Sequence, residues 1–209
     1  MLKVVYIDES VRDRSKFQRN FSDVFNIDTF HPEKEINLFI ESIFSHSPDL
    51  IVTDFCLSDN AEQGDEPVSY NGGELIKHIQ SYKLNFPCYV ATAYEDDAIG
   101  NANPDSVYVK EDINNNQETK HKMIQRMEAK VTQYQKWLSE IKEQFDELIK
   151  KKEGEGLTAK EENTFFELDT LIEKAINGTT ATSIIQKDTR NTQMLKDLIS
   201  KANAILERI

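Results

Sequence analysis

The chain has 209 residues, of which 38% are hydrophobic and 30% are charged, and its formal net charge is −12. The acidic excess lies in residues 1–112, with 9 Lys and Arg against 21 Asp and Glu, and leaves no basic patch, so we expect no nucleic-acid partner. No stretch resembles a signal peptide or reaches the roughly 18–20 apolar residues of a membrane span, so we expect a cytoplasmic protein with no membrane partner.

Five apolar runs predict strands, because they are rich in Val, Ile, Tyr and Phe and are bounded by polar residues or Pro. They span residues 3–8, 25–30, 49–55, 87–93 and 106–110. Between them, three stretches carry apolar residues at helical spacing, at 12–25, 33–46 (Leu38 and Ile40 with Phe44) and 72–83. Strands that alternate with helices predict a doubly wound α/β fold, in which both faces of a parallel sheet are covered.

The rest of the chain predicts helices. Residues 118–152 contain no Pro or Gly, and their apolar residues recur at alternating intervals of three and four, as in a coiled-coil seam. The seam consists of Ile124, Met127, Val131, Tyr134, Leu138, Ile141, Phe145 and Leu148. Two glycines then end the helix, and the capping-box spacing of Thr158 and Glu161 predicts a second helix that runs to Ile176. A third apolar series continues to the terminus: Leu195, Leu198, Ala202, Ile205 and Ile209.

We therefore divide the chain into a sheet domain at 1–115 and an all-α helical hairpin, bundle or coiled-coil region at 116–209. The heptad seam can pack inside a bundle of this chain or join two copies as a dimer. Its periodicity serves both arrangements equally well, so both remain open.

Polar residues end four of the five predicted strands. Asp8 and Glu9 close the first, Asp54 the third, Thr92 the fourth and Lys110 the fifth. In a parallel sheet these residues meet at one edge, where ligands bind. Three crowded carboxylates need a compensating cation, and their oxygens suit Mg²⁺. One carboxylate can accept a phosphoryl group, with the Thr hydroxyl and Lys ammonium donating to the phosphoryl oxygens.

Residues 1 to 113 resemble the receiver domain of two-component response regulators. The resemblance rests on five segments in the family's order: "VVYIDES", "PDLIVTDF", "NGGELIKHI", "VATA" and "VYVK". It implies a flavodoxin-like sheet of strand order 2-1-3-4-5 and a histidine kinase or phosphotransfer protein as partner. It also implies residue roles: Asp54 as phosphoacceptor, Thr92 and Lys110 as contacts of the phosphoryl group, and Asp8, Glu9, Asp54 and the backbone carbonyl of Cys56 as Mg²⁺ ligands.

The chain also departs from the receiver pattern. Ser58 replaces a Pro, and Gly72 follows Asp54 by 18 residues because an acidic insertion at 58–70 lengthens the loop beside the site. Glu111 replaces the Pro that follows the Lys. Val107 stands where an aromatic switch residue is expected, with Tyr108 one place off, and residues 93–109 are too few for a full fourth helix. We expect conventional chemistry at Asp54 and an altered surface for reporting it.

These observations predict a phosphorylatable switch that signals to an unknown downstream protein through a helical, non-DNA-binding output. The alternative is a receiver-based scaffold or phosphoryl sink, whose state does not switch the helical region. An enzyme with its own substrate is disfavoured, because the helical part has no nucleophile with a base, no phosphate loop and no metal-ligand spacing. We therefore expect only intrinsic self-phosphorylation and dephosphorylation. Cys56 and Cys88 lie in apolar runs and are expected to be free thiols.

Overall fold

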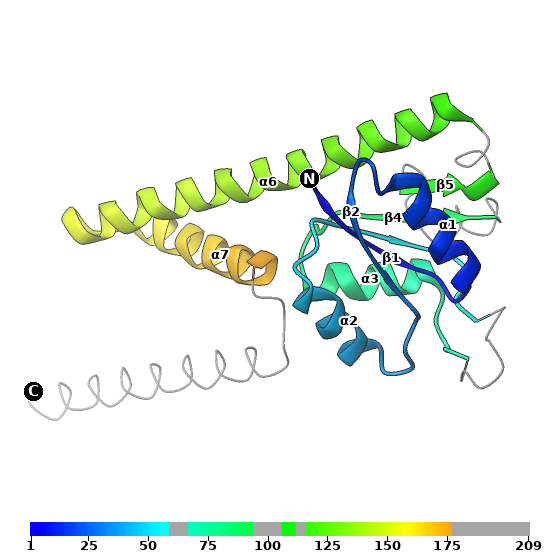
Figure 1. The fold of residues 1–209 in the computed structure, drawn as a ribbon. Coiled ribbons are helices and arrows are strands. Elements are labelled where there is room, and N and C mark those ends of the chain that lie inside the picture. Colours follow the sequence, from blue (N-terminus) through cyan, green and yellow to red (C-terminus); the bar gives the residue numbers. More distant parts are fainter. Residues whose placement is uncertain (59–66, 94–105, 112–115, 177–209) are drawn as a thin grey trace, which may run out of the picture.

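The computed structural model describes residues 1–58, 67–93, 106–111 and 116–176 (Figure 1). Its centre is a five-stranded sheet of order β2-β1-β3-β4-β5, in which every neighbouring pair is parallel. The strands are β1 (Lys3–Ile7), β2 (Asn26–Phe30), β3 (Leu50–Thr53), β4 (Cys88–Thr92) and β5 (Val107–Val109). The predicted flavodoxin-like strand order is confirmed.

Among the described residues, five helices accompany the sheet. They are α1 (Val11–Phe21), α2 (Ile36–Ser45), α3 (Gly72–Tyr82), α6 (Gln117–Gly154) and α7 (Ala159–Ile176). Side-chain caps fix several of their starts, because the first backbone N–H groups of a helix have no partner within it. Asn71 and Glu74 form a capping box on α3. Thr158 and Glu161 form the predicted one on α7, where the Thr158 N–H donates to Glu161 Oε2 at 2.9 Å.

Helices cover both faces of the sheet. On one face, Phe17 and Phe21 of α1 pack with Met123, Met127 and Val131 of α6. On the other face, α2 and α3 bury their apolar residues against the sheet: Phe39, Ile40, Ile43, Leu75 and Ile79. Leu38 shares the expected helical spacing but is 63% exposed, because the buried stripe of α2 runs through its neighbours Phe39 and Ile43 instead.

Helix α6 has 38 residues and serves two parts of the molecule. Its first half lies on the sheet, and its second half extends beyond the sheet beside α7 (Figure 1). Met123 and Met127 are fully buried in the core cluster that contains Tyr89 and Tyr108 of the sheet. The core of the sheet therefore draws on residues from both sides of the division that we placed at 115/116, and that division stays a prediction.

The second half of α6 and α7 form the predicted helical hairpin. Ile141 of α6 and Leu168 of α7 are buried, and the rings of Phe145 and Phe165 stack with centroids 4.7 Å apart. The heptad seam thus divides within one chain, with Met127 on the sheet and Phe145 on α7. The predicted third helix, from Leu195 to Ile209, lies outside the described residues.

The far end of α7 returns to the sheet domain. The Tyr134 hydroxyl donates to the Ala175 carbonyl at 3.0 Å, and the Leu84 N–H, after α3, donates to the Lys174 carbonyl at 3.1 Å. These bonds satisfy carbonyls of the last helical turn, which have no partner within the helix. Within the described ranges, no helix is both long and apolar enough to cross a membrane.

Candidate functional site

The carboxyl edge of the sheet gathers the predicted acidic residues. Ile7 and Thr53 are register partners on β1 and β3, so Asp8 and Asp54 follow side by side, and the Asp54 N–H donates to the Ile7 carbonyl at 2.8 Å. Carboxylate oxygens of Asp8, Glu9 and Asp54 all lie within 4.8 Å of one another. The three residues are only 0%, 3% and 5% exposed, so their charges are poorly screened by water.

Lys110 brings a positive charge into this cluster from the end of β5. Its Nζ lies 2.8 Å from Asp8 Oδ2 and 2.9 Å from Asp54 Oδ1, with Asp13 Oδ2 of α1 at 3.6 Å. One ammonium group does not balance the carboxylates of Asp8, Glu9 and Asp54. A set of buried carboxylate oxygens with an excess of negative charge fits a hard divalent cation such as Mg²⁺.

The protonation of Asp54 reflects this crowding. Burial raises the pKa of Asp54 to about 7; the Lys110 ammonium opposes that rise, and the Asp8 and Glu9 charges add to it. For Lys110, burial works to lower the pKa, but the charges of Asp54 and Asp8 outweigh burial and hold it above its usual value. Lys110 therefore remains a cation, whereas Asp54 changes charge near neutral pH in the absence of another cation.

The other predicted site residues lie at the same edge. Thr92 is the last residue of β4 and is fully buried. Cys56, two residues after Asp54, is half-buried. Neither it nor the buried Cys88, at the opposite end of β4, forms a disulfide, as expected. The contact of Thr92 with a phosphoryl group and the Cys56 carbonyl as a metal ligand stay predictions.

Gly72 holds the start of α3 directly against Asp54. A Cβ atom at this position would lie 1.9 Å from the Asp54 carbonyl oxygen and 2.9 Å from its carbonyl carbon. The Gly72 N–H also donates to the Phe55 carbonyl at 2.8 Å. Only glycine allows this close approach, so the "NGG" segment shapes the loop that carries the phosphoacceptor candidate.

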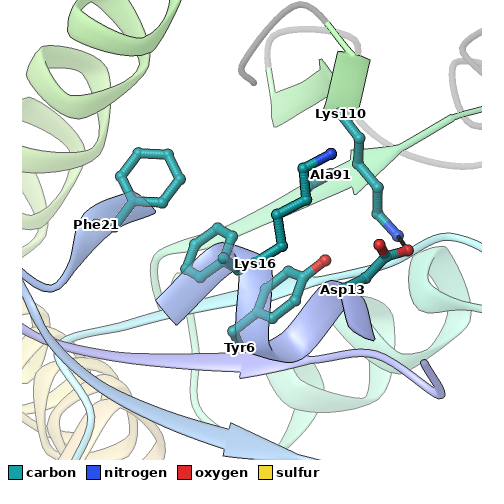
Figure 2. Close-up of a pocket in the computed structure, with 7 residues that line it drawn as sticks. Tyr6, Asp13, Lys16, Phe21, Ala91 and Lys110 are labelled. Carbon is teal, nitrogen blue, oxygen red and sulfur yellow. Dashed lines mark ion pairs between the residues drawn. The ribbon is translucent and has the colours of Figure 1, made fainter. Parts of the chain in front are cut away.

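Tyr6 is a site residue that the sequence analysis missed. Its hydroxyl donates to Asp8 Oδ2 at 2.6 Å. Burial and the Asp8 charge hold the pKa of Tyr6 well above its usual value, so the hydroxyl stays a donor. The sequence could have indicated this role, because alternate residues of a strand point to the same face, and Tyr6 lies two residues before Asp8. In Figure 2 the Tyr6 ring lies in the small pocket beside the Asp13–Lys110 ion pair.

The departures from the receiver pattern are partly visible. Tyr108 is 9% exposed and packs inward, with its ring centroid 5.3 Å from that of Tyr89. In the acidic insertion, Tyr70 is buried and its hydroxyl donates to the Glu33 carbonyl at 2.5 Å. Residues 59–66 of the insertion and 94–105 of the short fourth-helix region lie outside the described residues.

No protein-family model and no curated protein matches the chain. Solved structures of response regulators do resemble it. A CheY-like receiver domain from Methylobacillus flagellatus has 10% identity and a TM-score of 0.44, and the match covers 61% of this chain and 98% of that one. TrrA from Thermotoga maritima, in complex with Mg²⁺ and BeF, has 20% identity and a TM-score of 0.43, with 61% and 99% covered. RcsB from Salmonella typhimurium, described for its DNA interaction, has 14% identity and a TM-score of 0.43, with 86% and 93% covered.

Proposed function

We propose that the chain is a cytoplasmic phosphoacceptor response regulator, and that Asp54 receives a phosphoryl group from a histidine kinase or phosphotransfer protein. The observation that carries the proposal is the buried set of Asp8, Glu9 and Asp54 joined by Lys110 at the carboxyl edge of the sheet. Such a set is costly as a purely structural feature, because buried like charges repel one another.

In the proposed reaction, a carboxylate oxygen of Asp54 attacks the phosphorus of a phosphohistidine on the partner. The new P–O bond forms as the P–N bond breaks, and the leaving imidazole keeps the electron pair and takes up a proton. The product is an acyl phosphate on Asp54. Lys110 is placed to neutralise phosphoryl oxygens, since its Nζ is already 2.9 Å from Asp54 Oδ1, and Thr92 is the proposed hydroxyl donor.

Asp8, Glu9 and Asp54, with the backbone carbonyl of Cys56, are the proposed ligands of Mg²⁺. The bound ion would supply positive charge that offsets the carboxylates and the phosphoryl oxygens. Without an added cation, the carboxyl of Asp54 is partly protonated near neutral pH, because burial holds its pKa at about 7. A protonated carboxyl is a poor nucleophile, so a cation bound by these ligands would also favour the charged, reactive form of Asp54.

The proposed output is protein–protein interaction through the helical region, with no DNA contact and no substrate of its own. Two observations support it. The charges of residues 113–209 balance, with 16 Lys and Arg and 16 Asp and Glu, so they offer no basic excess for nucleic acid. Helix α6 contributes Met123 and Met127 to the sheet core and Ile141 to the hairpin, so it links the site-bearing sheet to the output. A homodimer through the hairpin is one form this output can take.

A scaffold or phosphoryl sink is the second candidate. Its support is the altered reporting surface, because Tyr108 is packed inward beside Tyr89 and Glu111 stands where the family carries Pro. In that case Asp54 is phosphorylated, but neither the oligomeric state nor partner binding responds.

The experiment is incubation of the full chain with Mg²⁺ and the small phosphodonor acetyl phosphate, followed by intact mass measurement. We expect the wild type to gain one phosphoryl group that hydroxylamine removes, as expected of an acyl phosphate, and Asp54→Asn to gain none. Asp23→Asn, which changes an exposed aspartate outside the site, is the matched control and should behave as the wild type. Equal labelling of Asp54→Asn and wild type would overturn the proposal.

Beryllofluoride with Mg²⁺ separates the two candidates. A switch should change its mass in solution or its hairpin conformation when this mimic of the phosphoryl group binds. A sink should bind the mimic without either change. A wild-type protein that does not bind the mimic at all would count against both.

A further inference from the structure

The hydroxyl of Tyr6 has no part in the proposed phosphoryl transfer, yet it binds one of the proposed metal ligands. Tyr6 lies on β1 and is 1% exposed. Its hydroxyl donates to Asp8 Oδ2 at 2.6 Å, a short hydrogen bond to a carboxylate. A donor on a metal-ligand oxygen controls how that oxygen is presented to a cation.

The Asp8 carboxylate is almost fully committed to donors. A carboxylate has about four lone-pair positions, two on each oxygen. Oδ2 accepts both the Tyr6 hydroxyl and the Lys110 ammonium, the latter at 2.8 Å. Oδ1 accepts the Ser10 N–H, also at 2.8 Å. The free lone pair of Asp8 is therefore on Oδ1, and a cation can take one oxygen of this residue.

Of the two donors to Asp8 Oδ2, Tyr6 and Lys110, Tyr6 is the one whose side chain is held in place by packing. Its ring stacks on Phe17 with centroids 3.9 Å apart and planes 3° from parallel, and Phe17 in turn packs on Phe21. The Lys110 side chain is 17% exposed and lies within reach of three carboxylates, so it can turn toward a phosphoryl group. When Lys110 turns away, Tyr6 still occupies one of the two lone-pair positions of Oδ2, so Oδ2 remains a poorer ligand for a cation than Oδ1.

We propose that Tyr6 is a specificity-determining residue for the cation: by occupying Oδ2, it restricts Asp8 to one-oxygen coordination and thereby disfavours Ca²⁺ relative to Mg²⁺. Mg²⁺ takes octahedral, one-oxygen ligands and retains waters, whereas Ca²⁺ takes 6–8 oxygens and often binds a carboxylate through both. This inference rests on the proposed function, since it requires a divalent cation among Asp8, Glu9 and Asp54.

The test is Tyr6→Phe, which removes the hydroxyl and keeps the ring stacked on Phe17. Tyr89→Phe is the matched control, because Tyr89 is buried on the same face of the sheet and donates to the Arg126 carbonyl at 3.0 Å, away from the carboxylates. Electron paramagnetic resonance measures bound Mn²⁺ on the full chain, and Mg²⁺ or Ca²⁺ is then added as competitor. Far-ultraviolet circular dichroism checks that each variant is folded.

We expect Tyr6→Phe to shift the ratio of Ca²⁺ to Mg²⁺ affinity about tenfold toward Ca²⁺, because loss of a group that hydrogen-bonds a metal ligand changes metal affinity by about tenfold or more. We expect Tyr89→Phe to leave this ratio unchanged. A ratio equal to wild type in a Tyr6→Phe protein that binds Mn²⁺, or a shift toward Mg²⁺, overturns the role of Tyr6 and leaves the proposed function standing. A wild type that binds no Mn²⁺ overturns both.

Discussion

At the scale of single residues, the main feature is the protonation of Asp54. Burial raises its pKa to about 7, whereas an unfolded chain holds an Asp near 3.9. The folded protein therefore binds a proton more tightly than the unfolded chain between about pH 4 and 7. The stability that this proton contributes is complete below pH 4 and is lost as the pH rises through 7. In the metal-free protein, the charged Asp54 thus opposes folding at pH 8.

We predict that Asp54→Asn raises the free energy of unfolding of the metal-free protein at pH 8 by about 1–3 kcal/mol, since one pKa unit corresponds to about 1.4 kcal/mol. The gain should shrink toward pH 5. Urea denaturation at several pH values measures it. Mg²⁺ should stabilise the wild type and have little effect on the variant.

Asp28→Asn is the matched control and should show the opposite sign. The hydrogen bond from His46 lowers the pKa of Asp28, so this carboxylate contributes stability above the unfolded pKa that is lost as the pH falls. This variant should be less stable than wild type at neutral pH, and the difference should vanish in acid. An Asp54→Asn profile that runs parallel to that of Asp28→Asn would contradict the assigned pKa.

Gly72 gives a second prediction at this scale. An added Cβ would lie 1.9 Å from the Asp54 carbonyl oxygen, so Gly72→Ala must displace backbone at the site. We expect a loss of about 2–3 kcal/mol in the free energy of unfolding, as for other overpacked positions, and weaker phosphorylation of Asp54.

Gly154→Ala is the control for Gly72→Ala. It adds the same methyl group in the last turn of α6, where nothing lies within 4 Å. Its stability should equal that of wild type or exceed it by up to about 1 kcal/mol, the difference in helix propensity. Similar losses in both variants would mean that the close approach to Asp54 does not limit position 72.

At the scale of elements, the first half of α6 is part of the sheet domain. We predict that Met127→Ala lowers the free energy of unfolding of the sheet by about 2–5 kcal/mol, because Met127 is fully buried there. Leu38→Ala removes a 63% exposed side chain of α2 and should change stability by less than about 0.5 kcal/mol. Urea denaturation followed by Tyr fluorescence measures both, and equal effects would contradict the shared core.

The elements also show how far the sequence determines this fold. The strand order and the meeting of Asp8, Asp54 and Lys110 were predictable, because parallel strands bring their carboxyl ends to one edge. It was not predictable that the first half of α6 packs on the sheet and the second half packs on α7. Intervals of three and four residues place apolar side chains on one helix face, and they do not say whether a sheet or a helix covers that face.

Two residues show the same limit locally. Met123 is fully buried, although the predicted seam starts at Ile124, because the sheet contacts a broader stripe of α6 than a coiled coil would. Tyr is a common residue type in strands, so nothing about Tyr6 itself marks it as a site residue. Only its position two residues before Asp8 links it to the site. The role of such a residue depends on the side chains that it contacts in the folded protein. The local sequence pattern does not identify those contacts.

At the scale of the whole molecule, the hairpin is fastened at both ends. Lys151 and Glu161 form an ion pair with an N–O distance of 2.6 Å near the turn between α6 and α7. At the other end, the Tyr134 hydroxyl and the Leu84 N–H bind the last carbonyls of α7. The carboxyl end of α7 is thereby hydrogen-bonded to the loop between α3 and β4 through Leu84.

We predict that Tyr134→Phe increases amide hydrogen exchange in the last turns of α7 about fivefold, since one hydrogen bond contributes about 1 kcal/mol net. Exchange in β1 and β3 should not change. Tyr70→Phe is the matched control, because it removes a hydroxyl bound to the Glu33 carbonyl on another part of the molecule. Mass-spectrometric hydrogen exchange measures both, and unchanged exchange in α7 of Tyr134→Phe would contradict this role for its hydroxyl.

Because α6 is one continuous helix, it fixes the rotation of the hairpin relative to the sheet about the axis of α6. The stripe at Met127 and Val131 meets the sheet, and the stripe at Ile141 and Phe145 meets α7 on the same helix. Each residue inserted or deleted between these stripes would turn one against the other by about 100°. A different hairpin can therefore replace this one only when it is joined in whole heptads, or nearly whole turns. The hairpin of this protein is therefore exchangeable only in steps of whole heptads or nearly whole turns, and cannot be joined at arbitrary positions.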